Sequence, residues 1–146
     1  PMHAEESALW SLDRKDGMEK AYCCFNSNAR DFARFGQLLL NNGQWDDRQL
    51  ISPAYLAEAT SPDTRLVYKD LGKPNHCYGF QYWILDYKGM KIPYMRGILG
   101  QYVFTLPEKN AVIVRLGHKR SDTYTADQHY PDDINTWLDA AMDLLQ

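Results

Sequence analysis

Two glycines, Gly97 and Gly100, interrupt an apolar and aromatic stretch at residues 94–106, and this placement favours a binding site. Glycine has no Cβ, so a ligand or another chain can lie against the main chain at such a position. The structural alternative is that both glycines mark a bulge or bend in an edge strand. The binding interpretation requires chemical partners elsewhere in the sequence.

Three side chains beside the glycines are candidates for ligand contacts. Arg96 can hold an acidic group through two parallel hydrogen bonds, and its alternative is a solvated arginine at a strand end. Tyr94 can line the same site, although a strand aromatic more often belongs to the core. Gln101 can face a ligand or be an ordinary strand residue.

Other reactive residue types do not form a recognisable site. His118, Ser121 and Asp122 have the chemistry of a catalytic triad, but nearness in sequence supplies none of the required geometry, so we predict no triad. Asp132 and Asp133 are expected to favour a helix start rather than to act as an acid–base pair.

The three cysteines, Cys23, Cys24 and Cys77, do not indicate a disulfide framework, because their number is odd. Adjacent cysteines are poor partners for each other, so we expect three small buried thiols. The pair His76 and Cys77 lies far in sequence from the other cysteines and does not have metal-ligand spacing. We therefore predict no metal and no cofactor.

Composition excludes several classes of protein. The chain has 146 residues, 45% of them hydrophobic and 24% charged, as in an ordinary globular domain. Its net charge is −3 and its basic residues are scattered, so we predict no nucleic-acid partner. No apolar run has the roughly 18 residues of a membrane span, and the first residues do not have the pattern of a signal peptide.

Capping residues and hydrophobic spacing predict three helices. Asn28 is a suitable N-cap for the first, with Asp31 three residues later, and Asn42-Gly43 ends it. Ser52 and Pro53 begin the second, which stops before residue 61. The third begins near Pro131. We expect its buried stripe to contain Ile134, Trp137, Leu138, Ala141 and Leu145.

Strand-like segments at residues 78–85, 91–96, 101–106 and 111–116 are joined by short connections, which predict an antiparallel meander. Residues 1–27 and 61–76 are expected to be irregular. The sequence therefore predicts one α+β domain at residues 1–146, of the α/β sandwich type. About four antiparallel strands would pack with two N-terminal helices and one C-terminal helix.

An ordered series of segments closely resembles class C β-lactamase-like and penicillin-binding-protein-like serine hydrolases, over roughly residues 8–146. The segments that carry the resemblance are residues 28–40, 42–45, 50–53, 78–83, 97–101 and 107–110. The resemblance implies a partial serine β-lactamase-like fold, ester or amide hydrolysis through an acyl-serine, and a small-molecule or peptide-like substrate. It also implies a bacterial protein of the periplasm or cell envelope.

In that family a third sequence motif, ending in glycine, lies on a strand, and the resemblance places it at Met95-Arg96-Gly97. Gly97 and the amide of Ile98 would then contribute to the oxyanion hole. Met95, Arg96, Gln101 and Tyr94 would be substrate-binding residues. Met95 stands where lysine or histidine is usual, which favours an activity other than β-lactamase. Arg96 cannot take its place, because neighbouring strand residues point to opposite faces.

The other two motifs of the family do not occur in this chain. No serine is followed at the third position by lysine, and no tyrosine is followed at the second position by asparagine. We therefore expect the C-terminal portion of a longer hydrolase, inactive alone, whose N-terminal part carries the nucleophile. The alternative is a non-catalytic binding or assembly module on a truncated hydrolase scaffold. Its exposed apolar surface would favour self-association or a partner.

Overall fold

Four antiparallel strands form the centre of the computed structural model, which describes residues 2–5, 7–69 and 72–145. Along the chain the strands are β7 (Trp83–Tyr87), β8 (Met90–Gly97), β9 (Gln101–Leu106) and β10 (Ala111–Arg115). Their order in the sheet is β10-β9-β8-β7, so each strand pairs with its neighbour in sequence. The predicted antiparallel meander is confirmed.

Tight connections determine the register of the meander. Lys88 and Gly89 join β7 to β8 with positive φ at both positions, 52° and 87°, a backbone that favours a two-residue hairpin loop. The 3₁₀ turn η1 (Pro107–Lys109) joins β9 to β10 and ends at Asn110 in the left-handed region. Because hairpin loops set register, these short loops determine which side chains share a face of the sheet.

Two predicted N-terminal helices begin at the predicted caps. Helix α1 (Ala29–Leu40) starts after Asn28, whose side-chain oxygen accepts the Asp31 amide at 2.9 Å. Helix α2 (Pro53–Ala59) starts after Ser52, whose hydroxyl accepts the Tyr55 amide at 3.1 Å. Gly43 follows α1 with φ of +82°, a backbone conformation that is strained for any residue with a side chain.

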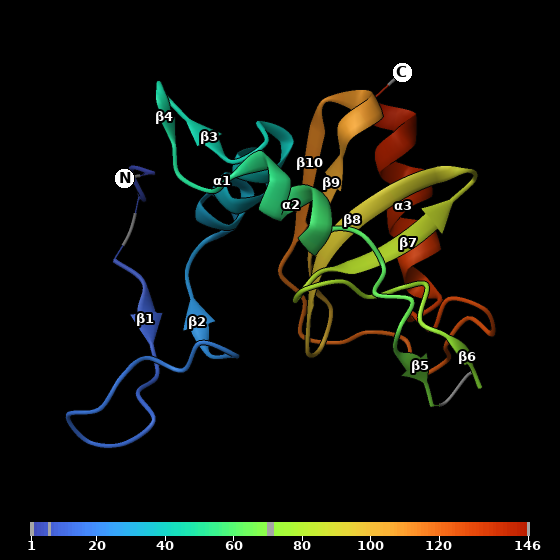
Figure 1. The fold of residues 1–146 in the computed structure, drawn as a ribbon, viewed down its shortest axis with the longest axis horizontal. Helices are drawn as coiled ribbons and strands as arrows, with labels where there is room; N and C mark the ends of the chain where they lie inside the picture. Colours follow the sequence, from blue (N-terminus) through green and yellow to red (C-terminus); the bar gives the residue numbers. More distant parts are fainter. Residues whose placement is uncertain (1, 6, 70–71, 146) are drawn as a thin grey trace.

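The helices cover both faces of the sheet (Figure 1). Helix α1 packs on β9 and β10, where Gly36 lies against Val103 and Val112. Helix α3 (Asp133–Leu144) packs on the opposite face and contributes Ile134 and Leu138 to the main core. The buried members of that core are Leu85, Tyr87, Ile92, Tyr94, Tyr102, Phe104, Leu106, Tyr130, Ile134 and Leu138. The described chain is thus a mixed α/β fold with three α-helices and antiparallel sheets.

Helix α3 differs from its predicted pattern. Trp137 was expected in the buried stripe, but it is 43% exposed and lies under the guanidinium of Arg115, 4.6 Å from its ring centroid. Leu145 follows the last helical residue and is also exposed. The 3.6-residue spacing of apolar residues predicts one broad buried face of the helix. Which residues at the margin of that face reach solvent depends on how α3 crosses the sheet.

Some short strands fall where irregular structure was expected. Strands β1 (Leu9–Trp10) and β2 (Phe25–Asn26) pair in the N-terminal segment, which extends away from the main sheet in Figure 1. Strands β5 (Val67–Tyr68) and β6 (Lys73–Pro74) pair in the loop before β7, and β3 (Gln44–Trp45) pairs with β4 (Arg48–Gln49) between α1 and α2. Each has two residues, too few for a hydrophobic pattern to show.

The first strand of the meander also begins later than predicted. Tyr78 forms only an isolated bridge, to Trp83, and the chain between them turns, with Gln81 at φ of 65°. Aromatic residues at alternate positions made residues 78–82 appear strand-like. The Gly79 amide instead donates to the Tyr82 carbonyl at 2.8 Å, which closes a tight turn.

The prediction for two of the cysteines is wrong. Cys23 and Cys24 form a disulfide with each other, although adjacent residues rarely have the geometry for it. Cys77 is a buried thiol, as predicted. In the described part of the chain, no helix is both long and apolar enough to span a membrane.

Candidate functional site

A pocket of about 230 Å³ lies at the end of strand β8, where the glycine-containing turn begins. It is lined by Trp83, Arg96, Gly97, Ile98, Arg120 and Tyr124. Three of these residues come from β8 and the turn after it, one from β7, and two from the long loop between β10 and α3. The fold therefore brings distant parts of the chain together around the predicted third motif.

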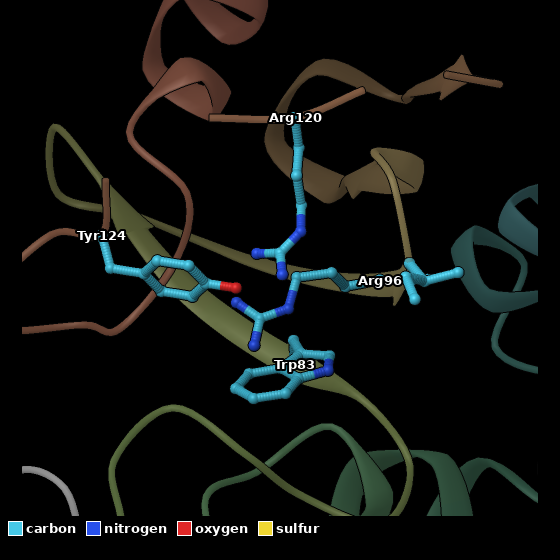
Figure 2. A pocket seen from close by; sticks show the side chains of 6 residues that line it. Trp83, Arg96, Arg120 and Tyr124 are labelled. Carbon is cyan, nitrogen blue, oxygen red and sulfur yellow. The ribbon is translucent and has the colours of Figure 1, made fainter. Parts of the chain in front are cut away.

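Arg96 occupies the centre of this pocket (Figure 2). Trp83 pairs with Tyr94 across the strands, so Trp83 and Arg96 lie on the same face of the sheet. The Arg96 guanidinium stacks 3.3 Å from the centroid of the Trp83 ring. Its Nη1 donates to the His129 carbonyl at 2.9 Å, which attaches the loop to the sheet.

Arg120 brings a second guanidinium group to the same pocket. It lies 5.0 Å from the centroid of the Tyr124 ring, and Tyr124 in turn lies 5.9 Å from the Arg96 guanidinium. Figure 2 shows the two guanidinium groups facing one another, with the Tyr124 hydroxyl directed toward Arg96. Within the described residues, neither arginine forms an ion pair with a carboxylate.

The neighbouring tyrosine and thiol do not neutralise Arg96. Burial raises the pKa of the Tyr94 hydroxyl, and the charge of Arg96 opposes this only in part. Burial likewise raises the pKa of the Cys77 thiol, again against the effect of Arg96. Both groups ordinarily titrate above neutral pH, so both stay protonated and uncharged.

The turn after β8 presents main chain at the pocket. Gly97 pairs with Gln101, and residues 98–100 form the connection to β9. Leu99 and Gly100 have φ of 59° and 83°, and Ile98 is 77% exposed. Position 100 has no room for a side chain, because a Cβ there would lie 1.8 Å from Nη1 of Arg115. The peptide at Gly97 and Ile98 is thus accessible beside the pocket.

The structure separates the other predicted site residues from the pocket wall. Met95 pairs with Val103, so it lies on the face of the sheet opposite Arg96. Tyr94 is buried in the core, 1% exposed and stacked on Phe104, and only its hydroxyl approaches Arg96, at 3.4 Å. Gln101 donates a hydrogen bond to the Gly117 carbonyl, which ties the start of β9 to the loop after β10.

Sequence reasoning missed Trp83, Arg120 and Tyr124 as pocket residues. Trp83 lies in the strand-like segment predicted at residues 78–85, and an aromatic residue in a strand more often belongs to the core. Arg120 and Tyr124 lie in a polar segment that has no period and no motif, so no pattern connected them to β8. The one available signal was an arginine and a tyrosine four residues apart in a long loop, which is weak by itself.

The arrangement can do two things chemically. Two guanidinium groups that pair with no carboxylate of the described residues attract an anion, and an accessible main-chain peptide can donate or accept hydrogen bonds beside it. Of the residues described, no group of three or more histidine, cysteine or acidic side chains is placed to hold a metal ion. The six lining residues include no serine, cysteine or histidine nucleophile.

Comparison with known proteins gives a likeness in fold. No protein-family model matches the chain, and no curated protein matches it. Among the solved structures that match is one described as "Putative 6-aminohexanoate-dimer hydrolase from Bacillus anthracis", with a TM-score of 0.69 and 25% sequence identity. The match covers 99% of this chain and 34% of that one. The chain thus has the fold of part of a hydrolase and spans about a third of that protein's length.

Proposed function

We propose that this chain is the C-terminal part of a serine hydrolase of the β-lactamase/penicillin-binding type, which cleaves an ester or an amide through an acyl-serine. The observation that carries the proposal is the likeness to a described hydrolase over 99% of the chain. The ordered segments of the sequence resemblance support it independently. The description of that hydrolase names a dimer of an amino acid as its substrate, which favours amide chemistry within this class.

Within such an enzyme, the main chain at the end of β8 would stabilise the negative charge that develops during the reaction. Attack of the serine oxygen on the carbonyl carbon places negative charge on the carbonyl oxygen, and a main-chain N–H can stabilise that charge. Gly97 leaves space for the substrate beside the strand, and the Ile98 amide is the proposed donor. The serine, and the base that takes its proton, would come from the N-terminal part of the same hydrolase.

The isolated 146-residue chain is expected to show no hydrolysis, because its sequence contains neither the S-x-x-K nor the Y-x-N motif. Nitrocefin and a p-nitrophenyl ester are suitable substrates, and a fluorescent fluorophosphonate would label any activated nucleophilic serine. Hydrolysis of either substrate that is abolished by prior treatment with the fluorophosphonate would contradict this expectation. A buffer blank and a heat-denatured sample measure the background.

The parent activity is tested separately, with the longest open reading frame that contains this chain. We expect the encoded protein to contain S-x-x-K and Y-x-N and to be labelled at the S-x-x-K serine. A serine-to-alanine variant at that position should remove the label. An open reading frame without these motifs, or an encoded protein that the fluorophosphonate does not label, would overturn the proposal.

A second candidate, a binding or assembly module, is favoured by the apolar side chains that the N-terminal segment exposes. Leu9, Met18 and Tyr22 are 73%, 76% and 79% exposed, and they lie on or between β1 and β2. Such a surface favours either self-association or contact with another part of the hydrolase.

Size-exclusion chromatography with light scattering tests this second candidate. If the segment mediates assembly, the purified chain should elute as a concentration-dependent oligomer, and a triple variant Leu9→Ser, Met18→Ser and Tyr22→Ser should elute as a monomer. A wild-type monomer at high concentration that binds no hydrophobic dye would argue against assembly.

A further inference from the structure

We infer that Arg115 is a positioning residue for the proposed hydrolysis. Its guanidinium holds the turn that carries the Gly97–Ile98 peptide and joins this turn to the loop that carries Arg120. The reaction in this statement rests on the proposed function, whereas the contacts of Arg115 are features of the fold. Arg115 is not among the six residues that line the pocket, so it would act on the site through these two segments.

Two divergent hydrogen bonds join Arg115 to separate parts of the main chain. Arg115 is the last residue of β10, and its Nη1 donates to the Gly100 carbonyl at 2.7 Å. Its Nη2 donates to the Lys119 carbonyl at 2.9 Å. Gly100 ends the connection from β8 to β9, whereas Lys119 directly precedes Arg120 of the pocket. One side chain therefore fixes the two segments relative to each other.

Two buried glycines leave the space that this guanidinium occupies. A Cβ at Gly100 would lie 1.8 Å from Nη1 of Arg115, and a Cβ at Gly117 would lie 2.2 Å from the same atom. Gly100 has a positive φ but Gly117 does not, so backbone conformation does not account for the glycine at position 117. The close approach of the guanidinium does account for it.

Aromatic rings hold the Arg115 guanidinium in this space. Its Cζ lies 4.6 Å from the centroid of the Trp137 ring and 5.7 Å from that of the Tyr102 ring. Tyr102 is the cross-strand partner of Arg115 on β9, and Trp137 comes from α3. Because the rings restrict the planar fork, its donors point at the two carbonyls before any substrate binds.

The position of the Gly97–Ile98 peptide matters because an oxyanion-hole donor acts at hydrogen-bond distance on a charge that develops in the transition state. Pairing of Gly97 with Gln101 closes the base of the turn, and Ile98 lies beyond it, 77% exposed. Arg115 holds the far side of the same turn, at Gly100. Without this hydrogen bond the turn can move, and the peptide loses a fixed place beside the pocket.

The first test measures backbone order in the intact 146-residue chain, which needs no nucleophile. Arg115→Met keeps an apolar stem against Trp137 but removes both donors. Amide order parameters from NMR relaxation should fall at residues 98–100 and 117–120, from about 0.85, as in rigid backbone, to below about 0.6. Those of β7, β8 and β9 should stay as in the wild type. Wild-type order at residues 98–100 would overturn the inference.

Further variants separate the two hydrogen bonds from the charge. Arg115→Lys keeps the charge but has no planar fork to span both carbonyls, so order at residues 98–100 should recover only in part. Gly117→Ala leaves Arg115 in place and fills the space beside Nη1, so it should loosen the same residues. Arg48→Met, at an exposed position on β4, is the matched control and should behave like the wild type. If Arg115→Met does not fold, the lysine and alanine variants decide, and wild-type order in both would contradict the inference.

The second test uses the full protein encoded by the open reading frame, with the p-nitrophenyl ester as substrate. Arg115→Met should lower kcat about tenfold or more, because a displaced oxyanion-hole donor is lost mainly from the transition state. KM should stay within about twofold of the wild type. Arg48→Met should change neither constant. A wild-type kcat in Arg115→Met, or a loss confined to KM, would overturn the inference.

The inference and the proposed function can fail separately. If the full protein forms no acyl-serine, the proposed function fails, and the order parameters of the 146-residue chain still decide whether Arg115 holds the turn. If the full protein is active and Arg115→Met keeps the wild-type kcat, the inference alone fails.

Discussion

Replacing Gly36 by valine is expected to lower the free energy of unfolding by about 2 to 3 kcal/mol, near the upper end for overpacking. A Cβ at this position would lie 2.5 Å from Cγ1 of Val112 and 3.1 Å from Cγ1 of Val103. Helix α1 would have to move away from β9 and β10, the strands that position the turn at the pocket. Urea denaturation followed by circular dichroism measures the change.

Two further variants show whether the loss comes from this contact. Gln37→Val places the same residue at the next, exposed position of α1 and should cost less than about 1 kcal/mol. Adding Val112→Ala to Gly36→Val removes the clashing methyl groups. The double variant should therefore lose less unfolding free energy than the two single variants lose together. Equal losses for Gly36→Val and Gln37→Val would contradict the close approach described above.

Replacing Asp31 by alanine is expected to lower the free energy of unfolding by about 3 kcal/mol, because it breaks a buried ion pair. Asp31 is only 3% exposed and accepts Nη1 of Arg34 at 2.6 Å, the Glu5 amide at 2.8 Å and the Ser27 hydroxyl at 2.9 Å. Removal of the carboxylate leaves these donors without their acceptor. Thermal and urea unfolding of both proteins measure the difference.

Asp47→Ala is the matched control for this carboxylate. Asp47 is exposed in the turn between β3 and β4, so its loss should change stability by no more than about 0.5 kcal/mol. Asp31→Asn keeps the shape but not the charge, and it should lose most of the same stability because its NH₂ group cannot accept from Arg34. If Asp31→Ala is as stable as Asp47→Ala, the carboxylate does not anchor the N-terminal segment to α1.

Local sequence signals predicted the elements that have strong capping or turn chemistry. Asn28 and Ser52 cap α1 and α2 as expected, and Gly89 lies in the predicted hairpin. Such signals act within a few residues, so the sequence shows them directly. Residues 78–82 were misassigned for the opposite reason, because an aromatic composition is shared by strands and by turns that pack on a core.

The sequence identified only some of the residues of the candidate site. Arg96, Gly97 and Ile98 were identified, because the glycine interrupts a strand and the resemblance placed a motif there. Arg120 and Tyr124 were not, because a polar loop without a period has no predictable path. Met95 and Arg96 were expected on opposite faces of β8, and the pairing of Met95 with Val103 and of Arg96 with Tyr102 places them so.

The sequence by itself determined the α+β class, the order of the meander, the caps of α1 and α2, and the short connection between β8 and β9. These features depend on neighbours in the chain and on periods of two or 3.6 residues, both of which can be read from the sequence. Tertiary structure alone decided that Trp83 supports Arg96 and that Arg120 faces it. It also decided that Trp137 reaches solvent and that Tyr94 stays in the core. Such contacts join residues far apart in sequence, and they form only when the whole core has packed and selected one path for each loop.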